Sequence, residues 1–161
     1  MKNPLVIVNI LICFFVFISC KKDNTGSTTA DKDYIVFGHF YGFCHGEQCI
    51  EIFKISAGKL YEDILDHYPG TENPYDGSYV LLTDEKYQLV KDMVNNIPNT
   101  LYQVNNHVIG TPDAGDWGGL YLEVTVNGQR RFWLFDKMKQ NLPEDLRPLA
   151  DEIERCISLV Q

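Results

Sequence analysis

Residues 120–135 read LYLEVTVNGQRRFWLF and carry the clearest structural signal in the chain. Apolar and polar side chains alternate through residues 120–126, as in a strand with one buried face. Asn127-Gly128 follows at once. This dipeptide suits a type I′ turn, which needs positive φ at both central positions. We therefore predict an antiparallel hairpin closed by a two-residue turn.

A two-residue turn also fixes which residues face each other across the hairpin. The predicted pairs are Val126 with Gln129, Val124 with Arg131, Leu122 with Trp133 and Leu120 with Phe135. These pairs make one face mainly apolar. On the other face, Glu123 and Arg130 lie close enough diagonally to interact.

Four more extended segments are predicted before the hairpin. Residues 34–41 are rich in β-formers and apolar on both faces, as expected of a strand covered on each side. A second strand at 49–55 and a third at 60–65 flank a turn at 56–59, and residues 78–82 add a short extended piece. Residues 67–77 contain two prolines and two glycines and are predicted to form a loop.

Two helices are predicted. Thr83 is a good N-cap for a helix that ends before Pro98, with Leu82 packing on Tyr87. Its apolar stripe would be Leu89, Val90, Met93, Val94 and Ile97.

The last helix begins near Pro143, and Pro148 should kink or restart it. Its apolar positions recur at steps of three and four: Leu142, Leu146, Leu149, Ile153, Ile157 and Val160. Strands are thus followed by a helix twice, which predicts an α+β fold, an antiparallel β-sheet with two α-helices packed on one face.

The N-terminal residues indicate an exported lipoprotein. Lys2 precedes an apolar run from Leu5 to Ile18, which is shorter than the roughly 20 residues that span a bilayer. Phe17-Ile18-Ser19-Cys20 reads as a lipobox. We expect residues 1–19 to be a lipoprotein signal peptide and Cys20 to carry the acyl chains, palmitate among them.

Residues 20–32 are then the lipidated cysteine and a flexible polar tether, and residues 33–161 one globular α+β domain. Two or more acyl chains make detachment from a membrane rare. Lys21 follows the cysteine where inner-membrane lipoproteins of enteric-type bacteria often carry Asp, which favours the outer membrane, lipid-anchored and facing either the periplasm or the cell surface.

Charge argues against nucleic acid as a partner. The chain has 14 basic and 22 acidic residues, a net charge of −8. A phosphate-binding surface needs clustered Lys and Arg, and the only tight basic pair of the domain is Arg130-Arg131. The expected partners are the membrane, through the lipid anchor, and a protein, peptide or glycan.

Three cysteines remain in the predicted mature domain: Cys44, Cys49 and Cys156. An oxidising compartment allows disulfides, and Cys44 and Cys49 are the natural pair. Cys156 falls on or near the apolar stripe of the last helix, where a free cysteine behaves as a small hydrophobe.

His39, Cys44, His45, Glu47 and Cys49 crowd into eleven residues, and three interpretations are open. A zinc site would need four ligands. A reactive dithiol would normally read Cys-x-x-Cys beside a helix start. A disulfide, or two free thiols without a role, is favoured, so no metal and no cofactor is predicted.

The loop Asp113-Ala114-Gly115-Asp116-Trp117-Gly118-Gly119 resembles a calcium-type loop, but an ordinary turn into the next strand is favoured. Trp117 is a candidate ligand contact, with a lid over the core as the simpler alternative. The sequence has no Gly-x-Ser-x-Gly or His-Glu-x-x-His motif. We therefore predict no catalytic residue and favour a role other than that of an enzyme.

The motifs from Cys44-His45-Gly46-Glu47-Gln48-Cys49, through Ala57-Gly58, to Leu142-Pro143-Glu144 resemble a family of small uncharacterised domains of Bacteroidetes-type lipoproteins. The resemblance covers most of residues 34–160. Family members tend to read Cys-x-Gly-x-Cys-Pro, whereas this chain has one more residue between the cysteines and Ile50 after them. The resemblance implies this type of fold and an envelope location. We expect a non-catalytic binding domain, with metal- or thiol-dependent activity at Cys44, His45 and Cys49 as the alternative.

Overall fold

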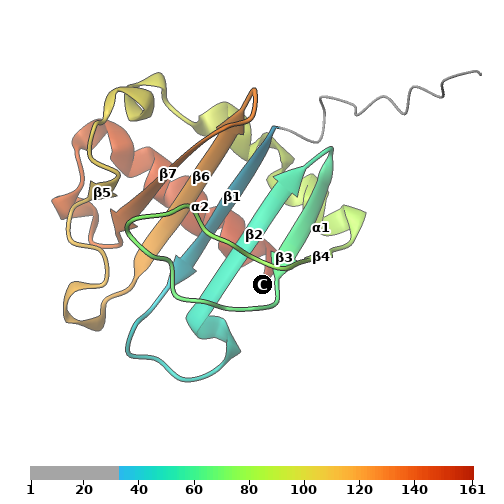
Figure 1. The fold of residues 1–161 in the computed structure, drawn as a ribbon, viewed down its shortest axis with the longest axis horizontal. Helices are drawn as coiled ribbons and strands as arrows, with labels where there is room; N and C mark the ends of the chain where they lie inside the picture. Colours follow the sequence, from blue (N-terminus) through green and yellow to red (C-terminus); the bar gives the residue numbers. More distant parts are fainter. Residues whose placement is uncertain (1–32) are drawn as a thin grey trace, which may run out of the picture.

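A computed structural model describes residues 33–161 of the chain. The predictions of a signal peptide, of acylation at Cys20 and of a tether concern residues outside this range. Seven strands form one sheet in the order β4-β3-β2-β1-β6-β7-β5, and two helices pack against one of its faces (Figure 1). The predicted α+β class is confirmed.

The strands are β1 Tyr34–Phe40, β2 Ile50–Ser56, β3 Lys59–Asp63, β4 Tyr79–Leu81, β5 Val108–Ile109, β6 Gly119–Val126 and β7 Gln129–Asp136. The α-helices are α1 Asp84–Val90 and α2 Arg147–Val160. Short 3₁₀ segments are Glu47–Cys49, Lys91–Asn96, Asn99–Gln103, Ala114–Asp116, Lys139–Asn141 and Glu144–Leu146. No described helix is long and apolar enough to cross a membrane.

Strand β1 lies in the middle of the sheet, antiparallel to both β2 and β6. This position explains its nearly unbroken apolar sequence, because both of its faces are buried. Phe37 packs into the large core under the helices, whereas Val36 and Phe40 pack into a second, smaller core on the opposite face.

The hairpin of β6 and β7 has the predicted register at every pair. Asn127 has φ 53° and Gly128 has φ 77°, the positive values that its turn requires. The predicted diagonal pair is also confirmed, since Arg130 Nε lies 2.6 Å from Glu123 Oε1.

Helix α2 supplies much of the main core through Leu149, Ile153, Ile157 and Val160. Pro148 falls in its first turn, directly after the 3₁₀ segment Glu144–Leu146, so the helix restarts there as predicted. Cys156 is a buried free thiol among these residues, also as predicted.

The first helix differs from the prediction. It is capped by Thr83, but α1 ends at Val90 and continues as a 3₁₀ helix. In a 3₁₀ helix residues three apart share a face. Val90 and Met93 are therefore both fully buried, whereas Leu89 and Val94 are 49% and 51% exposed, so the predicted five-residue stripe is wrong at these two positions.

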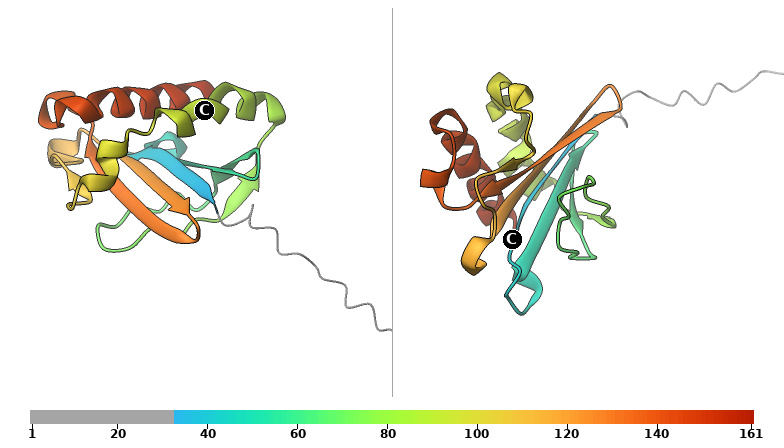
Figure 2. Two further views of the ribbon diagram at one scale, coloured as in Figure 1. Left: turned by 90° about the horizontal axis from the view of Figure 1, so that it is seen from above. Right: turned by 60° about the vertical axis from the view of Figure 1, so that its left-hand side comes forward.

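The face of the sheet opposite the helices is crossed by residues 64–78, which we call the covering loop (Figure 2). Tyr75 fixes this loop to the sheet. Its backbone N–H donates to the Tyr121 hydroxyl at 2.8 Å, and its own hydroxyl donates to Asp63 Oδ2 at 2.7 Å. The second core therefore lies between the sheet and the covering loop.

Candidate functional site

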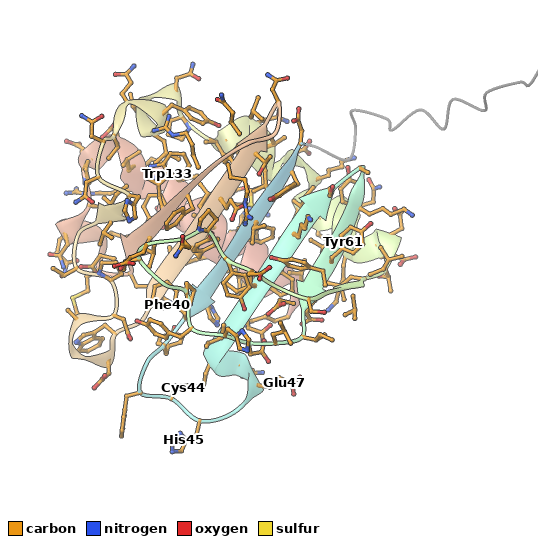
Figure 3. The ribbon with its side chains drawn as sticks, in the orientation of Figure 1. Phe40, Cys44, His45, Glu47, Tyr61 and Trp133 are labelled. Carbon is orange, nitrogen blue, oxygen red and sulfur yellow. A yellow bond between two sulfur atoms is a disulfide. The ribbon has the colours of Figure 1, made fainter. Side chains whose placement is uncertain are left out.

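The sheet has two distinct ends. Tyr34, the first residue of β1, pairs with Ser56 and Thr125, whereas Phe40 at its other end pairs with Ile50 and Gly119. A seven-residue strand spans about 20 Å. The loops 41–49 and 110–118 therefore lie far from Asp33, at what we call the distal end (Figures 1 and 3).

A disulfide closes the first distal loop. Cys44 and Cys49 are bonded, with their Cα atoms 5.6 Å apart, which confirms the predicted pair. Cys44 is exposed and Cys49 is buried. Because both sulfurs are in the disulfide, neither is the thiolate that a zinc site or a nucleophile requires.

The two histidines near this loop point to different partners. A ring nitrogen of His45, Nδ1, lies 2.8 Å from the Cys44 carbonyl oxygen, and His39 Nε2 lies 3.0 Å from the Gln48 carbonyl oxygen. Burial lowers the pKa of His39, which favours its neutral form. Within residues 33–161, no three His, Cys, Asp or Glu side chains form a metal-binding group.

Asp113 connects the distal loops. Its Oδ2 accepts hydrogen bonds from the Gly42 N–H at 2.8 Å and from the Tyr68 hydroxyl at 2.9 Å, and its Oδ1 accepts one from the Gly118 N–H at 2.9 Å. The donors belong to the disulfide-closed loop, the covering loop and the loop of Asp113 itself. The carboxylate that suggested a calcium-type loop therefore holds three protein segments together.

Trp117 lies in the third of these segments and is 62% exposed. The alternative that it forms a lid over the core is therefore wrong. The neighbouring Gly118 has φ 79°, and a Cβ atom there would lie 2.4 Å from the Tyr41 ring. Only glycine fits this close approach without a shift, so the backbone beside Trp117 is fixed against Tyr41.

Two more exposed aromatic residues occur in the connected loops: Phe43 is 79% exposed and Tyr68 is 48% exposed. We call Phe43, Tyr68 and Trp117 the distal aromatic surface. Each one either bonds to Asp113 or is next in sequence to a residue that does. Three segments that each expose one aromatic side chain are thus held together by one carboxylate.

Tyr68 is fixed at both ends of its ring. Its ring makes a T-shaped contact with that of Phe40, with ring centroids 5.0 Å apart, and its hydroxyl donates to Asp113. Burial and this hydrogen bond raise the pKa of Tyr68 to about 12, so it remains a hydrogen-bond donor at neutral pH.

The sequence indicated part of this site. It predicts roles for Cys44, Cys49 and Trp117, and the structure places their loops at one end of the sheet. Phe43, Tyr68 and the role of Asp113 were missed. The only available signal was that all three residues lie in glycine-containing loops, and this does not show which loops meet.

No protein-family model matches this sequence, and no curated protein matches it significantly. The resemblance to envelope lipoprotein domains therefore stays a prediction from the residues.

Proposed function

We propose that this protein is a non-catalytic binding domain of the cell envelope, lipid-anchored in the outer membrane, whose distal aromatic surface contacts a protein partner. The observation that carries this proposal is the arrangement around Asp113. Three loops fixed to one carboxylate expose Phe43, Tyr68 and Trp117 at the same end of the sheet.

This arrangement has the properties of a protein-binding surface. Trp and Tyr are enriched among the residues that contribute most to binding energy, because they bury a large area and lose little rotamer freedom. A surface that is already ordered also pays less entropy on binding. The Cys44–Cys49 disulfide and the bonds to Asp113 supply that order here.

The predicted lipid anchor is compatible with a binding surface at the distal end. An acylated Cys20 precedes Asp33 in the chain, and Asp33 adjoins the end of the sheet opposite the distal loops. The tether would therefore join the domain at the end away from the distal aromatic surface, and its flexibility would leave that surface free to meet a partner.

The alternative to a non-catalytic binding domain is a metal- or thiol-dependent activity at Cys44, His45 and Cys49. This alternative has less support, because the two sulfurs are bonded to each other and the His45 ring lies against the Cys44 carbonyl. We therefore favour binding without chemistry.

Site-specific photo-crosslinking in intact cells tests the proposed surface. A photoreactive phenylalanine analogue replaces Phe43, and in a control it replaces Leu89, which is 49% exposed on α1. We expect ultraviolet light to give a discrete protein adduct from position 43 only, and Trp117→Ala to reduce its yield. Absence of that adduct, or an equal adduct from position 89, would contradict the proposal.

The anchor is tested separately by mass spectrometry of the native protein. We expect an N-terminal peptide that begins at Cys20 and carries acyl chains on that residue. An intact leader or an unmodified Cys20 would refute lipid anchoring, whatever the crosslinking shows.

A further inference from the structure

A second candidate site lies on the face of the sheet opposite the helices, beside the covering loop. It is a pocket of about 160 Å³, and the residues that bear on its chemistry are Tyr34, Lys54, Asp76, Tyr79 and Arg130. They come from β1, β2, the covering loop, β4 and β7. The pocket is separate from the distal aromatic surface, and the inference below does not depend on the proposed function.

The wall around Arg130 is fixed by a buried carboxylate. Glu123 is fully buried and accepts hydrogen bonds from Arg130 Nε at 2.6 Å, the Tyr121 hydroxyl at 2.8 Å and the Tyr34 hydroxyl at 3.0 Å. Arg130 Nη2 also donates to the Tyr75 carbonyl at 2.9 Å, which ties the covering loop to this wall. The pocket is therefore formed before any ligand binds.

The Tyr79 hydroxyl is buried and has no hydrogen-bond partner among residues 33–161. Buried polar groups are nearly always paired, so an unpaired one calls for an explanation. Tyr79 lines the pocket, and the Lys54 ammonium lies 5.3 Å from the centroid of its ring and 4.2 Å from that of Tyr34. A ligand in the pocket is a natural partner for this hydroxyl.

The charges nearby decide the kind of ligand. Among the lining residues Lys54 and Arg130 are positive and Asp76 is negative. Behind the lining, Glu123 is paired with Arg130, and the charges of Asp63 and Glu123 also act on Tyr79. Burial first, then the charges of Asp63 and Glu123, raise the pKa of Tyr79. The same negative potential would oppose an anionic ligand, so a neutral one is favoured.

We propose that this pocket binds a neutral polyhydroxy compound the size of one sugar ring. Sugar hydroxyls both donate and accept, which matches the Tyr79 hydroxyl, the Lys54 ammonium as donor and the Asp76 carboxylate as acceptor. The tyrosine rings offer apolar surface to the C–H groups of the sugar. The pocket volume suits one ring, either as a free monosaccharide or as one residue of a glycan.

The test is an NMR titration of the full-length protein labelled with ¹³C in its tyrosine rings. The probes are glucose, galactose, N-acetylglucosamine and maltose, with glucuronate as the matched anion. We expect at least one neutral sugar to shift the Tyr34 and Tyr79 signals saturably, and glucuronate to bind more weakly. Tighter binding of maltose than of glucose would point to a residue within a glycan as the natural ligand.

Two variants assign the binding to this pocket. Tyr79→Phe removes only an unpaired hydroxyl, so it should fold normally and bind about fivefold to tenfold more weakly. Lys54→Met should also weaken binding. Tyr61→Phe is the matched control, since Tyr61 lies on β3 on the same face but does not line the pocket (Figure 3).

Three results would overturn the inference. These are no saturable shift with any neutral sugar, equal binding of glucuronate and glucose, and unchanged affinity in both the Tyr79 and Lys54 variants. The crosslinking result from position 43 has no bearing on these outcomes, so the two proposals fail separately.

Discussion

Asp113 is the residue that holds the three loops of the distal end in position. Its partners Gly42 and Tyr68 are 71 and 45 positions away in the sequence. A carboxylate that accepts several hydrogen bonds, including backbone N–H donors, is a strong local constraint because each bond is charge-assisted. One side chain therefore fixes the relative positions of three loops.

Asp113→Ala should loosen these loops and leave the core intact. We expect a loss of about 1–2 kcal/mol in the free energy of unfolding, because the donors sit near the surface and can bond to water instead. Hydrogen exchange should accelerate at the amides of Gly42 and Gly118. Amides of β1 should keep their protection.

Asp116→Ala is the matched control. Asp113 and Asp116 have φ values of 58° and 63°, so alanine meets similar backbone strain at both positions. Only Asp113 bonds to the other two loops. If both variants changed the exchange at Gly42 and Gly118 equally, backbone strain and not the carboxylate would explain the effect.

Glu51 makes the stability of the fold depend on pH. It is buried on β2, and burial together with the charges of Glu62, Asp66 and Glu47 raises its pKa to about 7 from an ordinary 4.5. Between pH 4.5 and pH 7, the folded protein therefore keeps a proton on Glu51 that the unfolded chain has released. The charged form destabilises the fold fully above pH 7, and this penalty declines as the pH falls toward 4.5.

Glu51→Gln should accordingly raise the urea midpoint at pH 8, and the gain should shrink toward pH 5. His39, which pairs with Glu51 across the strands, acts in the opposite direction because burial lowers its pKa. Comparing variant and parent at each pH removes most of the His39 contribution. An equal gain at both pH values would show that Glu51 is not protonated in this range.

At the scale of elements, the β6–β7 hairpin could be predicted residue by residue. Asn127-Gly128 leaves one turn type, and the pleat then fixes every opposing pair, Glu123 with Arg130 included. The cap at Thr83 was equally predictable, because its signal is contained within four residues.

Other elements depend on contacts that the sequence does not display. Strand β5 has two residues, too few to show alternation, and it is held by pairing with β7. Helix α1 ends at Val90 and continues as a 3₁₀ helix, although no Pro or Gly in that segment marks the change. Tyr75 belongs to a Pro- and Gly-rich loop whose composition indicates only irregular structure, yet its two hydrogen bonds shape the second core.

The same limit applies to the candidate site. A disulfide between Cys44 and Cys49 was predictable because the two residues are five apart in the sequence. The junction at Asp113 was not, since it joins segments far apart in the sequence. Such a junction becomes visible only when the sheet has brought these loops to one end.

At the scale of the whole molecule, three surfaces have different characters. The helices α1 and α2 close one face of the sheet (Figure 2). The distal end presents aromatic side chains, and the face opposite the helices holds the tyrosine pocket. The covering loop contributes to both candidate sites, through Tyr68 and Asp76. Between these two residues, the hydrogen bonds of Tyr75 to Asp63 and Tyr121 anchor the covering loop to the sheet.

Because of that anchor, the two sites should behave independently. Trp117→Ala should reduce crosslinking from position 43 and leave the sugar-induced shifts of Tyr79 unchanged. Tyr79→Phe should do the reverse. In the double variant, the changes in unfolding free energy should add to within about 0.5 kcal/mol, as expected for separated sites without shared partners. Urea midpoints of both single variants and the double variant measure this directly. A larger coupling energy, or a sugar that alters the crosslinking yield, would mean that the covering loop transmits a change from one site to the other.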